Sequence, residues 1–466
     1  MTGRNDADEL ALVLHTHMPY VEGFGTWPFG EEWLFEAMAT SYLPLLDVLA
    51  REDAAVTLSL TPVLCDQLEA PGIGERFLAF LRDVRAETHR RDIEGTRVGA
   101  PELVAELEAS ARDYAWAEQR FKAIGRDLLG ALTPYAGWTS AATHAVLPLL
   151  ATDAGVELQA ATGIASHRRR FGPWRGGFWL PECAHAQWLG PRLVDLGVKA
   201  VCVELTDVGG VRDLLMPVES EGGPTLVPVD REIIDLVWSD RGYPAHRTYR
   251  DYHHHTIHHH RPWANDGSRY DRQAARELAR EHARAFVARV KRRLGEGRRT
   301  WRQPSLCVCA LDTELLGHWW HEGVAWLDAV IDEARAQGVA LARLDDALAR
   351  REPAILDDPL PVTSWGAPRD LSTWDGPAVA DLAWRARAAE LRVAAAGGAA
   401  GERALRELLA LQSSDWAFMV TRGLAGDYPR ERADGHAAEL DRALASIGSA
   451  EPDLRSLAPQ LSRTAL

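Results

Sequence analysis

The stretch ELALVLHTHMPY, residues 9–20, is a short, continuous apolar run that ends in polar residues. An unbroken run of this kind is typical of a strand buried on both faces, as the strands of parallel sheets are. Strands that alternate with helices predict βα units, and therefore a parallel sheet or barrel. Four further stretches combine such a run with a helical pattern: AVTLSLTPVLCDQL (55–68), LVDLGVKAVCVEL (193–205), SLCVCALDTELLGHWW (305–320) and EARAQGVALARLDDALAR (333–350).

The chain is predicted to consist of two parts. Long amphipathic helices separate the strands, for example over residues 101–124 and 271–297, where apolar residues recur at three- and four-residue spacing. The segment REPAILDDPLPVTSWGAPRD contains four prolines and little periodicity, which is typical of a linker. We therefore predict an α/β domain over residues 1–357, with an inserted helical and loop subdomain around 185–300, and an α-helical domain over 358–466.

Composition limits the classes of partner. The 466 residues carry a net charge of -15, which argues against a nucleic acid or a membrane surface, because both bind basic faces. No segment approaches the ~20 apolar residues of a membrane span, and the acidic N-terminus is no secretion signal. The five cysteines are odd in number and include no CxxC pair, which favours reduced thiols and a cytoplasmic protein. The 17 tryptophans favour a carbohydrate ligand, since aromatic faces stack on sugar rings.

Histidines stand where the first strand ends and in one later turn. His15 and His17 are two residues apart, so their side chains share a face of the strand. Neutral imidazoles there are able to bind a metal ion or sugar hydroxyls, or to be satisfied by backbone groups. His144, in TSAATHAVLPLL (139–150), precedes an apolar run and is by itself more typical of a structural residue.

Two carboxylates follow predicted strands at the edge where parallel α/β folds bind their ligands. Glu182, in GGFWLPECAH (176–185), comes directly after Pro181, which stops the strand. Asp312 follows the run SLCVCAL and shares a face with Glu314. Two carboxylates beside aromatic residues suit a glycosidase, in which one attacks the anomeric carbon or stabilises its charge and the other protonates the leaving oxygen. Alternatively, Glu182 is a surface carboxylate and Asp312 caps the next helix.

Two other groups of residues allow two interpretations each. In the helical block, the Asp415–Trp416 pair is able to hydrogen-bond and stack on one sugar, and equally able to anchor a domain interface. The tract HHHTIHHH, residues 253–260, looks like a metal-binding tract or a tag. We interpret it as a solvated loop, for which adventitious metal binding is a better expectation than a functional metal site.

Taken together and in this order, these stretches resemble glycoside hydrolase family 57, and within it the 1,4-α-glucan branching enzymes. The matches run from about residue 10 to about residue 436 and cover most of the chain. They are LHTHMPYVEGFGTWPFGEEWLFEAMATSYLPLL (14–46), TSAATHAVLPLL, GGFWLPECAH, LDTELLGHWWHEG (311–323), SWG (364–366) and LLALQSSDWAFMV (408–420), followed by Arg432 and His436.

The resemblance implies an incomplete (β/α)7 barrel, similar to a TIM barrel, with helical insertions and an α-helical C-terminal domain. It implies a retaining double displacement on α-1,4-glucan, with Glu182 as the nucleophile and Asp312 as the general acid/base. It implies neither a metal nor another cofactor. The substrate-binding residues that it implies are His15, His17, Trp27, His144, Trp319, Trp365, Trp374, Asp415 and Trp416.

One stretch departs from the family pattern and leaves alternatives open. Over Tyr243–Tyr270 the chain reads YPAHRTYRDYHHHTIHHHRPWANDGSRY, where we expect a longer, aromatic-rich insert that controls the acceptor. A 4-α-glucanotransferase or an α-amylase of the same family is therefore an alternative to a branching enzyme. From other classes, the alternatives are a metal-dependent hydrolase similar to polysaccharide deacetylases, which would use His15 and His17, and a non-catalytic glucan-binding protein.

Overall fold

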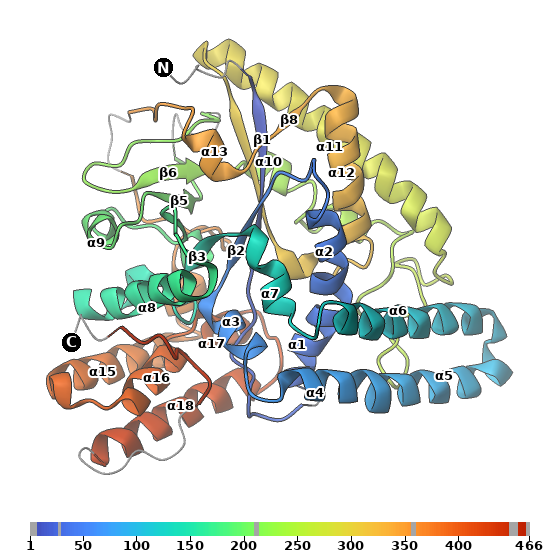
Figure 1. Ribbon diagram of the computed structural model, residues 1–466, viewed down its shortest axis with the longest axis horizontal. Coiled ribbons are helices and arrows are strands. Elements are labelled where there is room, and N and C mark those ends of the chain that lie inside the picture. Colours follow the sequence, from blue (N-terminus) through green and yellow to red (C-terminus); the bar gives the residue numbers. More distant parts are fainter. Residues whose placement is uncertain (1–6, 27–28, 209–213, 356–359, 447–454, 463–466) are drawn as a thin grey trace.

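The centre of the fold is a parallel sheet (Figure 1). The computed structural model describes residues 7–26, 29–208, 214–355, 360–446 and 455–462. Within them, seven strands pair in the order β6-β5-β4-β3-β2-β1-β7, and the two-residue strand β8 also pairs with β1. The strands are β1 (Glu9–Thr16), β2 (Val56–Leu60), β3 (Ala136–Ser140), β4 (Gly177–Trp179), β5 (Ala200–Val203), β6 (Thr225–Pro228), β7 (Leu306–Asp312) and β8 (Ala340–Leu341).

The sheet curves into a nearly closed barrel, which confirms the predicted incomplete (β/α)7 fold. Its two end strands approach each other, because the backbone N–H of Asp230, just after β6, donates to the carbonyl of Val308 in β7 over 2.8 Å. Every residue of β1 is buried, as the continuous apolar run predicts. The carboxyl ends of the strands therefore meet at one rim, where polar side chains from distant parts of the sequence come together.

Helices cover and connect the strands, and the helices predicted over 101–124 and 271–297 are observed as α6 and α11 (Figure 1). The α5/α6 pair projects from the barrel as a long helical hairpin. The helices of this part of the chain are α1 (Glu31–Ala37), α2 (Leu43–Leu49), α3 (Pro62–Leu68), α4 (Ile73–Ala79), α5 (Ala86–Gly99), α6 (Val104–Ala123), α7 (Leu128–Leu132), α8 (Asp153–Phe171), α9 (Leu189–Asp195), α10 (Arg231–Ile234), α11 (Arg272–Trp301), α12 (Gly323–Gln337) and α13 (Leu344–Leu348).

A further group of helices packs against the rim where the strands end (Figure 1). Their apolar faces form one cluster that also includes Tyr20 and Val63 from the barrel. Arg432, almost fully buried, donates from this group to the carbonyl of Tyr20 over 2.7 Å. The predicted domain boundary, between residues 357 and 358, lies outside the described residues. The helices are α14 (Ser372–Asp375), α15 (Ala380–Ala396), α16 (Glu402–Leu411), α17 (Ser414–Thr421) and α18 (Tyr428–Ala445).

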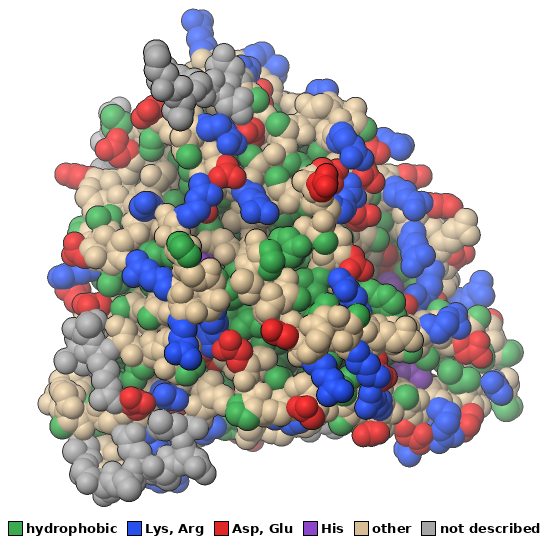
Figure 2. All heavy atoms as spheres, in the orientation of Figure 1, with side chains coloured by type: hydrophobic (Ala, Val, Ile, Leu, Met, Phe, Trp, Pro, Cys, Tyr) green, Lys and Arg blue, Asp and Glu red, His purple; other side chains and the backbone are tan. Residues whose placement is uncertain are grey.

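The molecular surface carries charged side chains of both signs (Figure 2). On the face shown in Figure 2, acidic and basic side chains are interspersed rather than gathered by sign. No helix within the described ranges is long and apolar enough to cross a bilayer.

The histidine tract over residues 253–260 is only partly a solvated loop. His253–His255 are exposed, whereas His260 is buried and contacts Asp92 over 3.0 Å.

Close packing of α8 on β3 depends on one glycine. An added Cβ at Gly163 would lie 1.9 Å from the carbonyl oxygen of Ser140, so we expect Gly163→Ala to lower the free energy of unfolding by about 1–3 kcal/mol. Gly95, on the exposed face of α5, has open space around its Cα, and Gly95→Ala should instead be neutral or stabilise by up to about 1 kcal/mol. Denaturant unfolding of both variants checks this, and equal stabilities would contradict the close approach.

Candidate active site

The ends of neighbouring strands bring the predicted site residues together. In the sheet register, His15 of β1 lies opposite Ser59 of β2 on one side and opposite Asp312 of β7 on the other. His17 directly follows β1, and Glu182 lies in a short 3₁₀ helix that follows β4. The site thus forms at the rim of the barrel, from segments that are far apart in the sequence.

Glu182 has an unusual backbone conformation. Its φ of 62° and ψ of 20° lie in the left-handed region, which few residues other than glycine adopt. The C-terminal part of the chain holds this turn in place: Trp365 donates its backbone N–H to the carbonyl of Glu182 over 2.9 Å, and His185 pairs with Thr363. Backbone strain of this kind is found at sites where the side chain must point in one direction.

The carboxylate of Glu182 receives two side-chain hydrogen bonds, one on each oxygen. Trp365 donates its indole N–H to Oε2 over 3.0 Å, and Ser414 donates its hydroxyl to Oε1 over 2.9 Å. Burial raises the pKa of Glu182, while these two bonds act in the opposite direction and the net shift is upward. Both donors lie in the C-terminal part of the chain, so this part completes the surroundings of the carboxylate.

A directed chain of hydrogen bonds leads to Glu182. Because Ser414 donates its only hydroxyl hydrogen to Glu182, its oxygen accepts from Nδ1–H of His144, over 2.8 Å. Nε2 of His144 then accepts from Nε2–H of His15 over 2.9 Å, and Nδ1 of His15 accepts from the hydroxyl of Ser59 over 3.3 Å. Burial lowers the pKa of both imidazoles well below the usual value, so both are neutral, as this chain requires.

His17 differs from its two neighbours in charge. Burial disfavours its charged form, but Asp415 contacts its Nε2 over 3.0 Å, and the pKa of His17 is raised overall. The Asp415 carboxylate therefore favours the charged form of the His17 imidazole. The ring stacks on His144 with centroids 4.1 Å apart, and its charge lowers the pKa of Glu182 and of Asp312.

Of the two carboxyl groups, Asp312 has the pKa that is raised further. Burial raises its pKa well above the usual value, and the nearby charges of Glu314 and Glu182 raise it further. No side chain within the described ranges donates a hydrogen bond to it, in contrast to Glu182. Glu314, whose pKa is raised to about 7 mainly by burial, accepts from Tyr42 over 2.5 Å.

This arrangement contains what a retaining glycosidase needs. One carboxylate, Glu182, is oriented and hydrogen-bonded, and the pKa of a second carboxyl, Asp312, is well above its usual value. The charge of Glu182 contributes to raising the pKa of Asp312, which is the coupling that a nucleophile and an acid require.

The predicted tryptophans occupy different environments. Trp365 contacts Glu182, whereas Trp319 is 40% exposed and lies beside Trp238. Trp374 and Trp416 are almost fully buried in the core of the C-terminal helices, where Trp416 donates to the carbonyl of Ala410. Trp27 lies outside the described residues. Glucan binding by these side chains stays a prediction.

The described part of the chain contains no set of metal ligands that the metal-dependent alternative would need. No three His, Cys, Asp or Glu side chains there are grouped so that they could hold a metal ion. Both ring nitrogens of His15 are engaged, by Ser59 and by His144, and both of His17 are engaged, by Thr61 and by Asp415.

Sequence reasoning did not identify Ser59 and Ser414 as site residues. Ser59 is a small polar residue inside the apolar strand VTLSL, and Ser414 begins helix α17 next to Asp415. Their positions in the sequence signal a buried hydroxyl and a helix start, but the partners of these hydroxyls lie 44 residues or more away. Only the folded arrangement shows that they belong to one hydrogen-bonded chain.

Comparisons with known proteins identify the family of the chain. The profile of glycosyl hydrolase family 57 matches residues 138–354, and that of the 1,4-alpha-glucan branching enzyme C-terminal region matches residues 382–464. The chain is 32% identical to a 1,4-alpha-glucan branching enzyme of Thermococcus kodakarensis, over 93% of this chain and 73% of that protein. It is 33% identical to a probable 1,4-alpha-glucan branching enzyme of Mycobacterium tuberculosis, over 91% of this chain and 90% of that one.

Solved structures extend the similarity to three dimensions. The crystal structure of a branching enzyme of the same family from Pyrococcus horikoshii superposes with a TM-score of 0.88 at 31% identity, over 94% of this chain and 90% of that one. The Thermococcus branching enzyme, solved in complex with glucose, superposes with a TM-score of 0.86 at 30% identity, over the same shares of the two chains.

The hydrogen bond from Ser414 should tune the ionisation of Glu182. Ser414→Ala removes a donor that favours the carboxylate, so we expect the acidic limb of the kcat/KM profile for glycosidic cleavage to move to higher pH by about one unit. Activity at a given acidic pH should therefore fall, because a raised pKa of Glu182 leaves less of it as the carboxylate. The profile is measured with a soluble glucan between acidic and neutral pH.

Ser59→Ala provides the matched control, because Ser59 stands at the far end of the same chain. It leaves the bond to Glu182 in place, so its acidic limb should move much less than that of Ser414→Ala. An acidic limb that does not move in Ser414→Ala contradicts the role assigned to this hydroxyl.

Proposed function

Since the chain belongs to glycosyl hydrolase family 57, we propose that it is a 1,4-α-glucan branching enzyme that uses Glu182 and Asp312. The observation that carries the proposal is the pair of partly buried carboxyls at the rim, of which one is hydrogen-bonded twice and the other has a strongly raised pKa. The substrate class follows from relatives that are branching enzymes and align with more than nine-tenths of the chain.

In the first half-reaction, the Glu182 carboxylate attacks the anomeric carbon of an α-1,4-linked glucose. The bond to the leaving oxygen breaks, and Asp312 transfers its proton to that oxygen, which releases a shortened glucan. The product is a glycosyl ester on Glu182. Trp365 and Ser414 hold the attacking carboxylate in its orientation before the step, so little reorganisation is needed.

In the second half-reaction, Asp312 is ionised and acts as the base. It accepts the proton of the 6-hydroxyl of an acceptor glucan, whose oxygen attacks the anomeric carbon, and Glu182 leaves as a carboxylate. An α-1,6 branch forms and both residues return to their starting ionisation. Transfer to a 4-hydroxyl or to water would instead give a 4-α-glucanotransferase or an amylase, and the loop over residues 243–270 is the segment we expect to decide between them.

We also propose that the protein is cytoplasmic. All five cysteines are buried and free, which suits a reducing cytoplasm. An α-1,4-glucan made and stored inside the cell is the corresponding substrate.

Removing the proposed nucleophile tests the function directly. Glu182→Gln keeps the size of the side chain but cannot form the ester, so we expect both transfer and hydrolysis of amylose to fall at least about a thousandfold. Activity is followed by debranching the product, because new α-1,6 linkages distinguish branching from disproportionation or hydrolysis. Glu221→Gln, at an exposed carboxylate, is the control and should retain full activity. Near-full activity of Glu182→Gln would exclude this nucleophile.

A substrate whose leaving group needs no protonation distinguishes the role of Asp312 from that of Glu182. Asp312→Asn should lower activity on amylose by about 10²–10⁴-fold, since the leaving oxygen is no longer protonated. With α-maltosyl fluoride, whose leaving group departs without a proton, the rate of fluoride release should fall far less. Equal losses on both substrates would mean that Asp312 does more than transfer this proton.

A further inference from the structure

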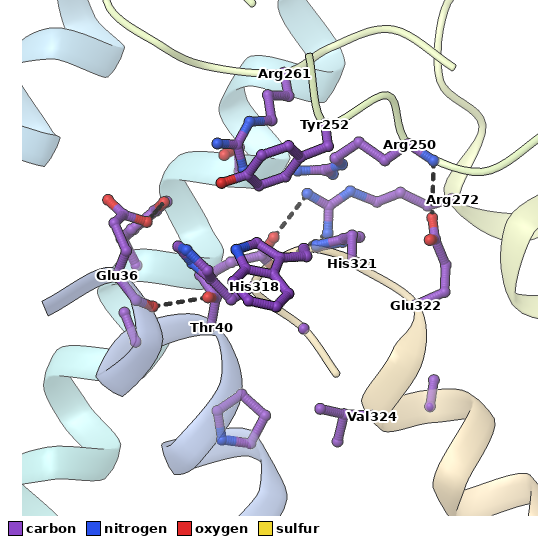
Figure 3. Close-up of a pocket in the computed structure, with 18 of the residues that line it drawn as sticks. Glu36, Thr40, Arg250, Tyr252, Arg261, Arg272, His318, His321, Glu322 and Val324 are labelled. Carbon is purple, nitrogen blue, oxygen red and sulfur yellow. Dashed lines mark hydrogen bonds and ion pairs between the residues drawn. The ribbon is translucent and has the colours of Figure 1, made fainter. Parts of the chain in front are cut away.

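A large cavity lies beside the candidate active site and does not include its carboxylates. It has a volume of about 550 Å³, within the range of sites for small organic ligands. Its walls come from the segment that runs from α1 to α2, from α6 and from Arg85. The loop at 250–261, the start of α11, and the turn before α12 with the first residues of α12 complete them. Figure 3 shows Tyr252 and Arg261 above His318, and Glu36 to one side.

The cavity and the candidate active site share a wall one helix thick. Helix η1 (Met38–Tyr42) faces the cavity with Thr40. Ser41 and Tyr42 of the same helix donate hydrogen bonds in the other direction, to the turn that follows Asp312. A ligand in the cavity would therefore lie close to the catalytic rim without touching the reacting atoms.

Most arginines on the walls are already paired with carboxylates. Arg85 pairs with Glu36, Arg272 pairs with Glu106 over 2.8 Å, and Arg250 pairs with the same Glu106. Charges of both signs alternate around the cavity and neutralise one another at close range. This arrangement does not favour an anionic ligand, which would meet carboxylates on several sides.

Other polar atoms on the walls have no partner within the described part of the chain. Oε2 of Glu322 accepts no hydrogen bond, and Nε of Arg250 and Nε of Arg261 donate none, but these three atoms are enclosed by protein and do not face the cavity. The histidine rings on the wall are the groups with free polar atoms. His318 and His321 make no side-chain hydrogen bond. Burial, reinforced by nearby arginines, lowers the pKa of both rings, to about 4 for His318, so each presents one donor and one acceptor.

Aromatic faces complete the lining. The guanidinium of Arg261 lies 4.1 Å from the ring centroid of Tyr252, which holds that ring in place at the cavity wall. Trp319, on the same wall, is 40% exposed. Closely spaced donors and acceptors beside aromatic faces match a sugar, whose hydroxyls donate and accept and whose C–H faces stack on rings.

We propose that this cavity is a second carbohydrate site, which binds a neutral α-linked glucose oligosaccharide beside the catalytic rim. The inference rests on the proposed function, because it takes the same class of polymer as its ligand. A glucan held here stays near the acid/base, and this raises the effective concentration of chain at the catalytic site.

Counting bound oligosaccharide tests the proposal. The full chain with Glu182→Gln, which prevents turnover, is titrated calorimetrically with maltoheptaose, and we expect two molecules to bind. Adding Tyr252→Ala should remove one of them or weaken it at least tenfold. The matched control is Trp384→Ala, since Trp384 is an exposed aromatic with Arg387 stacked on it, 5.1 Å from its ring, far from the cavity lining. Two molecules should still bind to this control.

Hydrogen exchange provides an independent readout of the same site. Maltoheptaose should protect the amides of residues 250–261 in the Glu182→Gln protein and no longer do so after Tyr252→Ala. Unchanged stoichiometry and affinity in Tyr252→Ala would overturn the proposal, as would displacement of the second maltoheptaose by inorganic phosphate, which would identify an anion site. Failure of the proposed function is a separate result, the absence of new α-1,6 linkages in the products of the unmodified protein.

Discussion

The register of β1 between β2 and β7 is the constraint on which the site depends. It places His15 opposite Ser59 on one side and Asp312 on the other. Because side chains alternate between the two faces of a strand, a shift of one residue would turn His15 away from the rim and break the chain that leads to Glu182. All three strands are buried from end to end or nearly so, so a shifted register would also move their few polar side chains into the apolar core.

The C-terminal part of the chain completes the surroundings of the candidate site. Ser414 and Trp365 supply both hydrogen bonds to the Glu182 carboxylate, and Asp415 raises the pKa of His17. Both hydrogen bonds favour the charged form of the Glu182 carboxylate and oppose the effect of its burial. The barrel and the C-terminal part therefore have to assemble before Glu182 has its two donors.

The periodic patterns in the sequence predict the barrel, because a buried strand is a local signal. The polar residue that follows a strand is a local signal too, and it marks Glu182, Asp312, His15 and His17 as candidate site residues. The roles of the Ser59 and Ser414 hydroxyls cannot be predicted from the sequence, because their hydrogen-bond partners lie far away along the chain. The placement of Trp374 and Trp416 in an apolar core was equally hidden, because a tryptophan in a sequence does not indicate which surface covers it.

The division of roles between the two carboxyls follows from their hydrogen bonds. Both are buried and close enough to influence each other, so only one of them ionises easily. Glu182 has two donors and Asp312 has none within the described ranges, so the negative charge settles on Glu182. In the proposed mechanism, the ester on Glu182 removes that charge and lowers the pKa of Asp312, so that the same residue would act first as an acid and next as a base.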